Sequence, residues 1–155
     1  MSKLQQELRQ GQPFTSPAME TFLNLLRTAE AARAAEADLL HAHNLTGASY
    51  NVLRILRGAG DDGHQCQEIG ARMVTRVPDV TRLVDRLEQR GLVERRRCER
   101  DRRVVYVRIK KPALDLLAQL DAPVAAMPER FFAGLAAKDL RTLNQLLVKA
   151  RPDHA

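Results

Sequence analysis

The sequence predicts a mainly α-helical protein with one small β-hairpin. Leu and Ala dominate the 155-residue chain, whereas aromatic residues make up only 4% of it, and Leu and Ala favour helices. Apolar residues recur at spacings of three and four over most of the chain, the period of an amphipathic helix. Residues 105–109 (VYVRI) differ, because their apolar side chains alternate with Tyr106 and Arg108 as they do in a strand.

A long first helix is expected over residues 17–43, with Asn44 ending it. Its Ala-rich middle, AEAARAAEA, favours a helix and allows a neighbouring helix to approach closely. The apolar positions at helical spacing are Phe22, Leu25, Leu26, Ala29, Ala32, Leu39 and Leu40. Residues 1–16 are polar and contain Gly11 and Pro13, so they are expected to form an arm or a frayed extension.

Three shorter helices are expected next. Thr46 is a suitable N-cap for a helix that stops before the breaker GAGDDG at residues 58–63. A short helix over residues 65–73 follows, and residues 74–77 form a turn. The third of these helices is expected over residues 78–90, and its two faces differ sharply.

The helix at residues 78–90 has an aliphatic face and a polar face. Pro78 is expected as its first residue, where the missing N–H of proline is not needed, and Gly91 as its stop. The residues expected in the core are Val80, Leu83, Val84 and Leu87. The polar face carries Pro78, Thr81, Arg82 and Asp85, with Asp79 and Arg86 on its flank.

Residues 92–97 and 105–109 are expected to pair as a hairpin whose tip begins at Cys98 and reaches Asp101. Pro112 then starts a further helix, which Pro123 and Pro128 should kink or break. A last helix is expected over residues 137–150. The order of the elements is typical of a winged helix-turn-helix lobe at residues 46–111, flanked by long helices in residues 1–45 and 112–155.

The positive charge of the chain is concentrated in one segment. The formal net charge is +6, yet ten basic and three acidic residues lie between Arg90 and Lys111. The rest of the chain carries 15 basic and 16 acidic residues and is nearly neutral. Such a patch is typical of proteins that bind a polyanion. The alternative is a solvated surface that only keeps the protein soluble, but charge of that kind is usually dispersed.

These features together favour binding of double-stranded DNA. A helix fits into the major groove, and a basic hairpin beside it reaches phosphates and the minor groove. The candidate contacts on and before the helix are Arg76, Pro78, Asp79, Thr81, Arg82 and Arg86. Phosphate contacts are expected, as a group, from Arg95, Arg96, Arg97 and Arg102. The alternative for the helix is a solvated face with an Arg82–Asp85 pair, and Asp85 is expected to be structural.

The run PDVTRLVDRLEQRGLVERRRCERDRRVVYVRI resembles the recognition helix and wing of the multiple-antibiotic-resistance regulator (MarR) family. The specific matches are VTRLVDRLEQRGLVER, the DRR at residues 101–103 and the alternating VxVxI after it. The flanking helices also fit, so the resemblance covers nearly the whole chain. It implies a homodimer built by the N- and C-terminal helices, which usually represses transcription from pseudo-palindromic sites. It also implies that Arg103 enters the minor groove, with Asp101 orienting it.

Many members of this family release DNA when a small phenolic or aromatic molecule or an oxidant acts on them. An effector pocket between the dimerisation helices and the DNA-binding lobe is therefore implied. Chosen by position, its candidate residues are His41, His43, Tyr50 and Arg54. Peroxide sensing is not expected, because the first long helix has no cysteine near its start. Lys110, Lys111 and Pro112 also depart from the Thr or Ser common before the following helix.

No cofactor or metal is expected. His41 and His43 are two apart on a helix, so their side chains diverge by about 200° and do not share an ion easily. Cys66 and Cys98 form no CxxC pair, which favours a reducing compartment. Cys66 is expected to pack in the interior, although a helix N-terminus could lower its pKa. Cys98 is expected to be exposed, where its oxidation could weaken DNA binding.

Two other classes of function remain open. A winged helix can bind a protein partner or structured RNA instead of duplex DNA. An enzyme is not favoured, because the sequence has no Gly-rich phosphate loop, metal-ligand cluster or nucleophile–base pairing. The chain has neither an apolar signal core near its start nor an apolar stretch of about 18–20 residues, so a cytoplasmic location away from membranes is expected.

Overall fold

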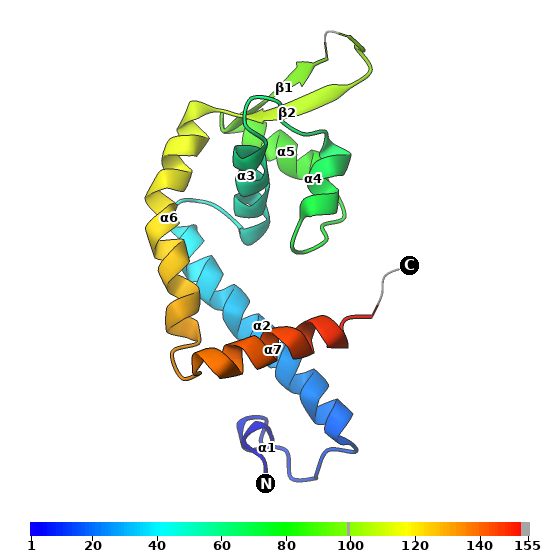
Figure 1. Cartoon of the computed structure of the whole chain (residues 1–155), viewed down its shortest axis with the longest axis vertical. Coiled ribbons are helices and arrows are strands. Elements are labelled where there is room, and N and C mark those ends of the chain that lie inside the picture. Colours follow the sequence, from blue (N-terminus) through cyan, green and yellow to red (C-terminus); the bar gives the residue numbers. More distant parts are fainter. Residues whose placement is uncertain (99, 153–155) are drawn as a thin grey trace.

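The computed structural model describes residues 1–98 and 100–152. In chain order its elements are α1 (Lys3–Glu7), α2 (Pro17–His41), α3 (Gly47–Ala59), α4 (Cys66–Arg72), α5 (Val80–Gln89), β1 (Val93–Arg97), β2 (Val105–Ile109), α6 (Lys111–Phe131) and α7 (Ala137–Ala150). Figure 1 shows an elongated molecule in which α3, α4, α5 and the hairpin form a lobe at one end. Helix α6 runs from this lobe toward the other end, where α1, the start of α2 and α7 lie.

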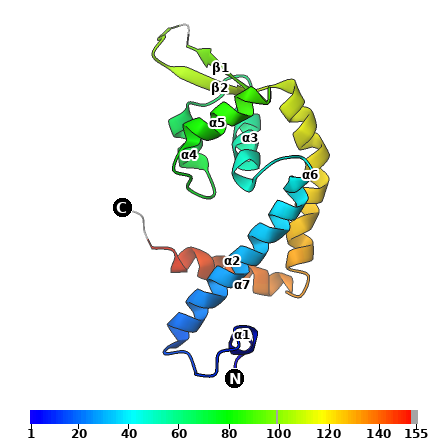
Figure 2. The ribbon, with the colours of Figure 1, turned by 180° about the vertical axis from the view of Figure 1, so that it is seen from behind.

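The core of the lobe lies where α3, α4 and α5 meet the hairpin (Figure 2). Its fully buried side chains include Leu53 and Leu56 of α3, Ile69 of α4 and Val107 of β2. The aliphatic face predicted for the helix at residues 78–90, which is α5, is confirmed, because Leu83, Val84 and Leu87 are buried and Val80 packs against them. Burial of such side chains is the main favourable term that holds the lobe together.

Helix α5 begins two residues later than predicted. Pro78 lies outside it, and Asp79 is its N-cap, with Asp79 Oδ1 accepting a hydrogen bond from the backbone N–H of Arg82 at 2.8 Å. A side-chain acceptor at this position satisfies an N–H that the helix itself leaves without a partner, so Asp79 outcompetes Pro78 as the start signal. Gly91, at φ 69°, follows the end of the helix as predicted.

The two strands pair antiparallel, with Val93 opposite Ile109 and Arg97 opposite Val105. Before α4 the chain adds one more pairing: the backbone of His64 exchanges two hydrogen bonds with Val107, at 3.0 and 2.8 Å. This bridge attaches the α3–α4 connection to the inner strand of the hairpin. The wing is therefore anchored to the lobe at its base, whereas its burial decreases along β1 toward Arg97.

The long helices differ from the prediction in two places. Helix α2 ends at His41 rather than at His43, and Asn44 takes a left-handed conformation (φ 53°) in the turn to α3. Pro123 and Pro128 were expected to kink or break the following helix: a break is wrong, because α6 continues through both prolines, and the helix bends in Figure 1. Each proline removes one backbone hydrogen bond, and the neighbouring turns of this 21-residue helix hold it together. Helix α7 has the predicted bounds.

The prediction of an arm at residues 1–16 is wrong in part, because α1 forms within it. Ser2 and Gln5 make a capping box at its start, with hydrogen bonds of 2.7 and 3.3 Å between them. Leu4 is buried, and Glu7 pairs with Arg27 of α2 at 2.8 Å. The Ser-x-x-Gln pattern in the sequence is a capping box that indicates the start of a helix. A helix of five residues is too short to show the apolar period that would support this prediction.

Candidate DNA interface and effector cavity

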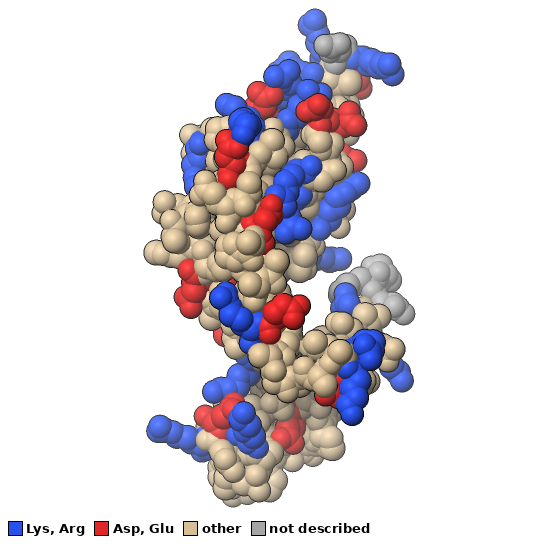
Figure 3. Space-filling view, turned by 60° about the vertical axis from the view of Figure 1, so that its left-hand side comes forward, with Lys and Arg blue, Asp and Glu red and all other residues tan. Residues whose placement is uncertain are grey.

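Basic side chains gather at the end of the molecule where the hairpin projects, at the top of Figure 3. On the helix side, Thr81, Arg82 and Arg86 of α5 are exposed, as are Arg76 and Pro78 in the turn before it. The aliphatic face of α5 is buried against the lobe, so the opposite face has to point outward. The structure thus brings the helix candidates together on one surface.

Asp79 has a structural task at this surface. An exposed Asp at this position could accept from a cytosine amino group or orient the side chain of Arg76 or Arg82. Its carboxylate instead accepts from the Arg82 backbone N–H, as described above, although the side chain remains exposed. Through this cap Asp79 fixes the first turn of α5, which carries Thr81 and Arg82.

The wing tip is held by a short turn centred on Asp101. Asp101 Oδ1 accepts from the backbone N–H of Arg103 at 2.9 Å, and the Asp101 carbonyl accepts from Val104 N–H at 3.0 Å. Asp101 thus orients Arg103 through its backbone, and the side chains of Arg102 and Arg103 are exposed. Cys98, expected to be exposed, is half-buried, and its backbone N–H donates to the Val104 carbonyl at the base of this turn.

The arginines of β1 do not share one environment. Arg97 is exposed and forms no ion pair with another described residue, and Arg96 pairs with Glu94 on the same strand at 2.6 Å. Arg95 is turned toward α5, where it binds Asp85 and Glu88. The structure therefore gives Arg95 a position that differs from the predicted phosphate contact, and it supports the structural role expected for Asp85.

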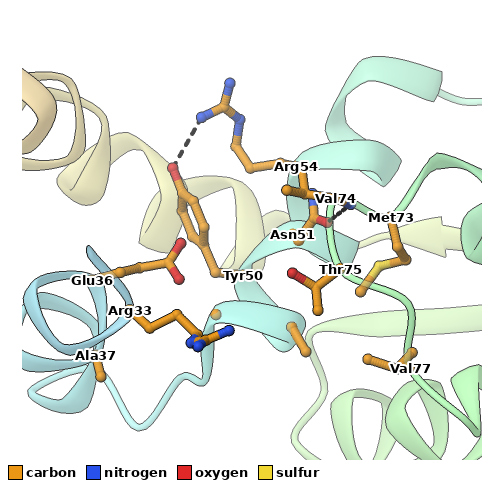
Figure 4. A pocket seen from close by; sticks show the side chains of 12 residues that line it. Arg33, Glu36, Ala37, Tyr50, Asn51, Arg54, Met73, Val74, Thr75 and Val77 are labelled. Carbon is orange, nitrogen blue, oxygen red and sulfur yellow. Dashed lines mark hydrogen bonds between the residues drawn. The ribbon is translucent and has the colours of Figure 1, made fainter. Parts of the chain in front are cut away.

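A cavity of about 560 Å³ lies between α2, α3 and the α4–α5 connection. Figure 4 shows Arg33 and Glu36 reaching it from α2, Tyr50 and Asn51 from α3, and Thr75 from the connection. Its remaining lining residues are Ala37, Gly47, Ala48, Arg54, Met73, Val74 and Val77. The wall thus combines apolar surface with a few polar and charged groups, as small-molecule sites do.

Two of the four predicted effector residues line this cavity. Tyr50 and Arg54 do so, and the Arg54 guanidinium donates to the Tyr50 hydroxyl at 3.0 Å. His41 and His43 do not line it: His41 is the last residue of α2, and His43 lies in the turn after it, where its carbonyl accepts from Arg90 at 3.3 Å. Sequence reasoning missed Arg33 and Glu36, since nothing in the pattern of a long helix shows which face meets the lobe.

Comparison with known proteins places this geometry in a family. The MarR family model matches residues 45–105. A MarR transcription factor from Planctomyces limnophilus is 38% identical in sequence, and the alignment covers 89% of this chain and all of that one, with a TM-score of 0.68. The chain belongs to the MarR family. The resemblance predicted from the recognition-helix and wing motifs is confirmed, as are the winged helix-turn-helix fold and the function class, a DNA-binding transcriptional regulator.

Two further relatives of this MarR-family protein are more distant. The HTH-type transcriptional regulator MhqR of Bacillus subtilis is 28% identical over 108 residues, which are 70% of this chain and 73% of that protein. A single-residue mutant of MarR from E. coli, solved in complex with operator DNA, has a TM-score of 0.79 at 21% identity, over 91% of this chain and all of that one. The second likeness shows the shared fold.

The cysteines and histidines of this MarR-family protein belong to no metal-binding cluster among the described residues. Residues 1–98 and 100–152 contain no cluster of three or more His, Cys, Asp or Glu side chains that could hold a metal ion. Cys66 begins α4 and packs, half-buried, against the core of the lobe, in line with its expected packing role. Over the same residues no helix has the length and apolar character that a membrane span requires.

Proposed function

We propose that the chain is a homodimeric repressor that binds pseudo-palindromic duplex DNA and releases it when a small aromatic acid occupies the cavity. The observation that carries the DNA-binding part is the placement of the exposed arginines. Arg82 and Arg86 of α5 and Arg102 and Arg103 of the wing tip form no ion pair with any other described residue. Side chains of this kind are available to phosphates and base edges.

The separation of the DNA-binding lobe from the flanking helices along the chain supports the same proposal. The proposed DNA interface lies within residues 46–111, where Asp79 and Asp101 hold the start of α5 and the wing tip. The contacts themselves would come from Arg76, Pro78, Thr81, Arg82, Arg86, Arg96, Arg97, Arg102 and Arg103. Arg103 would enter the minor groove, with the turn at Asp101 holding it there. Residues 1–45 and 112–155 would carry the dimer contacts and leave the winged lobe free to meet DNA.

Exposed apolar side chains on the flanking helices support the dimer. Helix α2 exposes Met19, Phe22, Leu25 and Leu26, and α7 exposes Leu146, Leu147 and Val148. Several large apolar side chains on adjacent turns of a helix are costly to leave in water, and a second subunit would cover them. Phe22 and Leu26 lie one turn apart, so they belong to the same stripe of α2.

The effector part of the proposal rests on the cavity. Tyr50, Met73 and Val77 offer apolar surface to an aromatic ring, and Arg33 offers a positive charge to a carboxylate. The cavity lies between α2, which belongs to the proposed dimer region, and the winged lobe. A ligand there would therefore favour one orientation of the lobe over another, provided that its affinity for the two differs.

Selection of bound sequences from a random duplex DNA library tests the DNA-binding part. We expect a palindrome whose half-sites lie about 10 bp apart from centre to centre, because two recognition helices should meet successive major grooves. Mobility-shift assays on the selected duplex should also show affinity that falls steeply with salt. Absence of an enriched sequence, together with flat salt dependence, would contradict the proposal and favour a module that binds a protein or RNA.

A further inference from the structure

Arg95 of β1 lies against α5 rather than on the outer surface of the wing. Its guanidinium donates to Glu88 Oε2 at 2.5 Å and to Asp85 Oδ1 at 2.6 Å, and its backbone N–H donates to Glu88 Oε1 at 2.9 Å. A longer contact of 3.4 Å reaches the Thr81 carbonyl. Its side chain is 25% exposed, whereas that of the next residue, Arg96, is 59% exposed.

These contacts fix one strand along nearly two turns of the helix. Thr81, Asp85 and Glu88 succeed one another at spacings of four and three residues on the same face of α5. The planar guanidinium holds two carboxylates in defined directions, which a flexible ammonium group cannot do. Burial lowers the pKa of Arg95, but the hydrogen bonds to Asp85 and Glu88 outweigh burial and the pKa is raised.

The place of Arg95 in the hairpin makes this attachment important. Arg95 is the middle residue of β1 and pairs with Val107 of β2. Val107 is buried in the core, but from Val93 onward β1 itself becomes progressively more exposed, so hydrophobic packing does not hold the outer part of β1. The backbone link between α5 and β1 is short and contains Gly91 at φ 69°. Arg95 is thus a side-chain tie between the helix and the wing beyond this link.

We propose that Arg95 is a positioning residue, which sets the angle between α5 and the wing by bridging Asp85 and Glu88 and does not itself contact DNA. This inference rests on the proposed function, because the angle matters only if both elements must fit neighbouring grooves of one duplex. A phosphate contact would act through its charge. A positioning residue acts by orienting the wing relative to α5, so its loss lowers the affinity for the operator more than the affinity for a duplex of unrelated sequence.

Asp85→Ala tests this role, because a charge effect and a positioning effect change operator affinity in opposite directions. Neutralising an acidic residue near DNA removes repulsion, so the matched control Glu94→Gln, which disturbs a pair within β1 alone, should strengthen binding. Asp85→Ala removes the same charge but also one arm of the Arg95 bridge. We expect it to weaken binding to the selected operator roughly tenfold while binding to a scrambled duplex of equal length does not weaken.

Substitution of Arg95 separates geometry from charge. Arg95→Lys retains the positive charge but cannot bridge both carboxylates, so operator binding should again weaken about tenfold. Arg97→Lys, which keeps the charge of a proposed phosphate contact on the exposed part of the same strand, should change operator binding less than Arg95→Lys does. Removing one phosphate contact from each subunit of a dimer should lower the slope of log binding constant against log salt concentration by about 1.8. We expect this change for Arg97→Gln. Arg95→Gln should leave the slope unchanged.

Thermal melting of each variant shows whether the lobe remains folded, and a loss of operator affinity at an unchanged Tm supports positioning. Full operator affinity of Arg95→Lys, or stronger operator binding by Asp85→Ala, would overturn the inference even though the wild type binds DNA. Failure of the wild-type protein to select any sequence would instead overturn the proposed function and this role with it. If either Asp85→Ala or Arg95→Lys has a lowered Tm, the other variant still tests the positioning role of Arg95.

Discussion

Arg57 of α3 and Asp121 of α6 form a two-pronged ion pair, with guanidinium nitrogens 2.9 and 2.8 Å from the two carboxylate oxygens. The pair joins the winged lobe to the long helix that leads toward the other end of the molecule. The hydrogen bond from Arg57 lowers the pKa of Asp121 and outweighs the opposing effect of partial burial; the charges of Arg57 and Arg54 act in the same direction. The carboxylate is therefore bound in its ionised form.

The lowered pKa of Asp121 predicts a loss of stability in acid. A carboxylate whose pKa is lower in the folded chain stabilises the fold above its ordinary value of 3.8, and this contribution disappears as the pH falls through the lowered pKa. Asp121→Asn should therefore melt below the wild type at pH 7, and the difference should shrink below about pH 4. Melting curves from pH 7 to pH 3 test this. Asp38→Asn, an exposed carboxylate with no ion pair to a described residue, is the control.

Gly63 is required where the chain meets the wing. Its φ is 69°, and a Cβ added there would lie 2.3 Å from the Val107 carbonyl oxygen, next to the His64–Val107 bridge. Gly63→Ala should lower the free energy of unfolding by about 2 kcal/mol or more. Gly58→Ala should raise it by about 0.5–1 kcal/mol, because Gly58 lies within α3 with open space around it. Denaturant unfolding measures both, and equal effects would contradict this account.

Much of this fold could be predicted because local signals agree with one another. The aliphatic stripe of α5, the strand at residues 105–109 and the bounds of α7 depend on neighbours within a few residues, and all three are confirmed. The end of α2 and the continuity of α6 could not be predicted in this way. Tertiary packing decides whether a helix tolerates a proline such as Pro123, and one sequence does not display that packing.

The site was predictable only to the level of surfaces. The pattern indicates which face of α5 points outward, and it cannot show that Arg95 turns inward while Arg97 remains exposed. That difference arises because Glu88 and Asp85 lie opposite one strand position only. The lining of the cavity could not be predicted from local sequence either, since Glu36 and Tyr50 come from different helices and line one cavity only in the folded chain.

The wing tip and the helix should differ in how their loss changes DNA binding. Arg103→Ala should weaken binding to all duplexes and lower the salt slope, because the proposed contact is electrostatic and recognises groove shape. Arg82→Ala should also relax the sequence preference, by about 1–3 kcal/mol at the base pair it recognises. Repeating the selection with each variant measures this. If both variants keep full affinity and preference, the assignment of this surface to DNA is wrong.

Charging the apolar stripe of α2 should separate the subunits. Phe22 is 56% exposed and Leu26 is 48% exposed in the single chain, so Asp at both positions disturbs little within one subunit. In the proposed dimer the same change would bury unpaired charges, which costs several kcal/mol. We expect monomers in sedimentation experiments and weak operator binding. Val74→Asp, at an exposed apolar residue of the winged lobe, serves as the control and should leave the dimer intact.

The cavity makes a prediction about ligand charge. Arg33 and Glu36 are both on α2 and both line the cavity, so they act in opposite directions on an anion bound between them. A Cβ built at Gly47, the first residue of α3, would lie only 2.4 Å from Glu36 Oε2, which places this carboxylate at the positive end of that helix. A ligand carboxylate would compete with Glu36 for this position. Glu36→Gln should therefore tighten the binding of benzoate, and Arg33→Gln should weaken it.

Calorimetric titration with benzoate and with neutral benzamide tests this prediction. Each substitution should change benzoate affinity several-fold, in opposite directions, because charges a few ångströms apart near the surface interact by about 1–4 kcal/mol before screening by salt. Benzamide has the same ring without the charge, so its affinity should change little in either variant. Bound benzoate should also raise Tm, since a ligand that prefers the folded chain stabilises it. Equal responses of the two ligands would show that charge does not guide binding here.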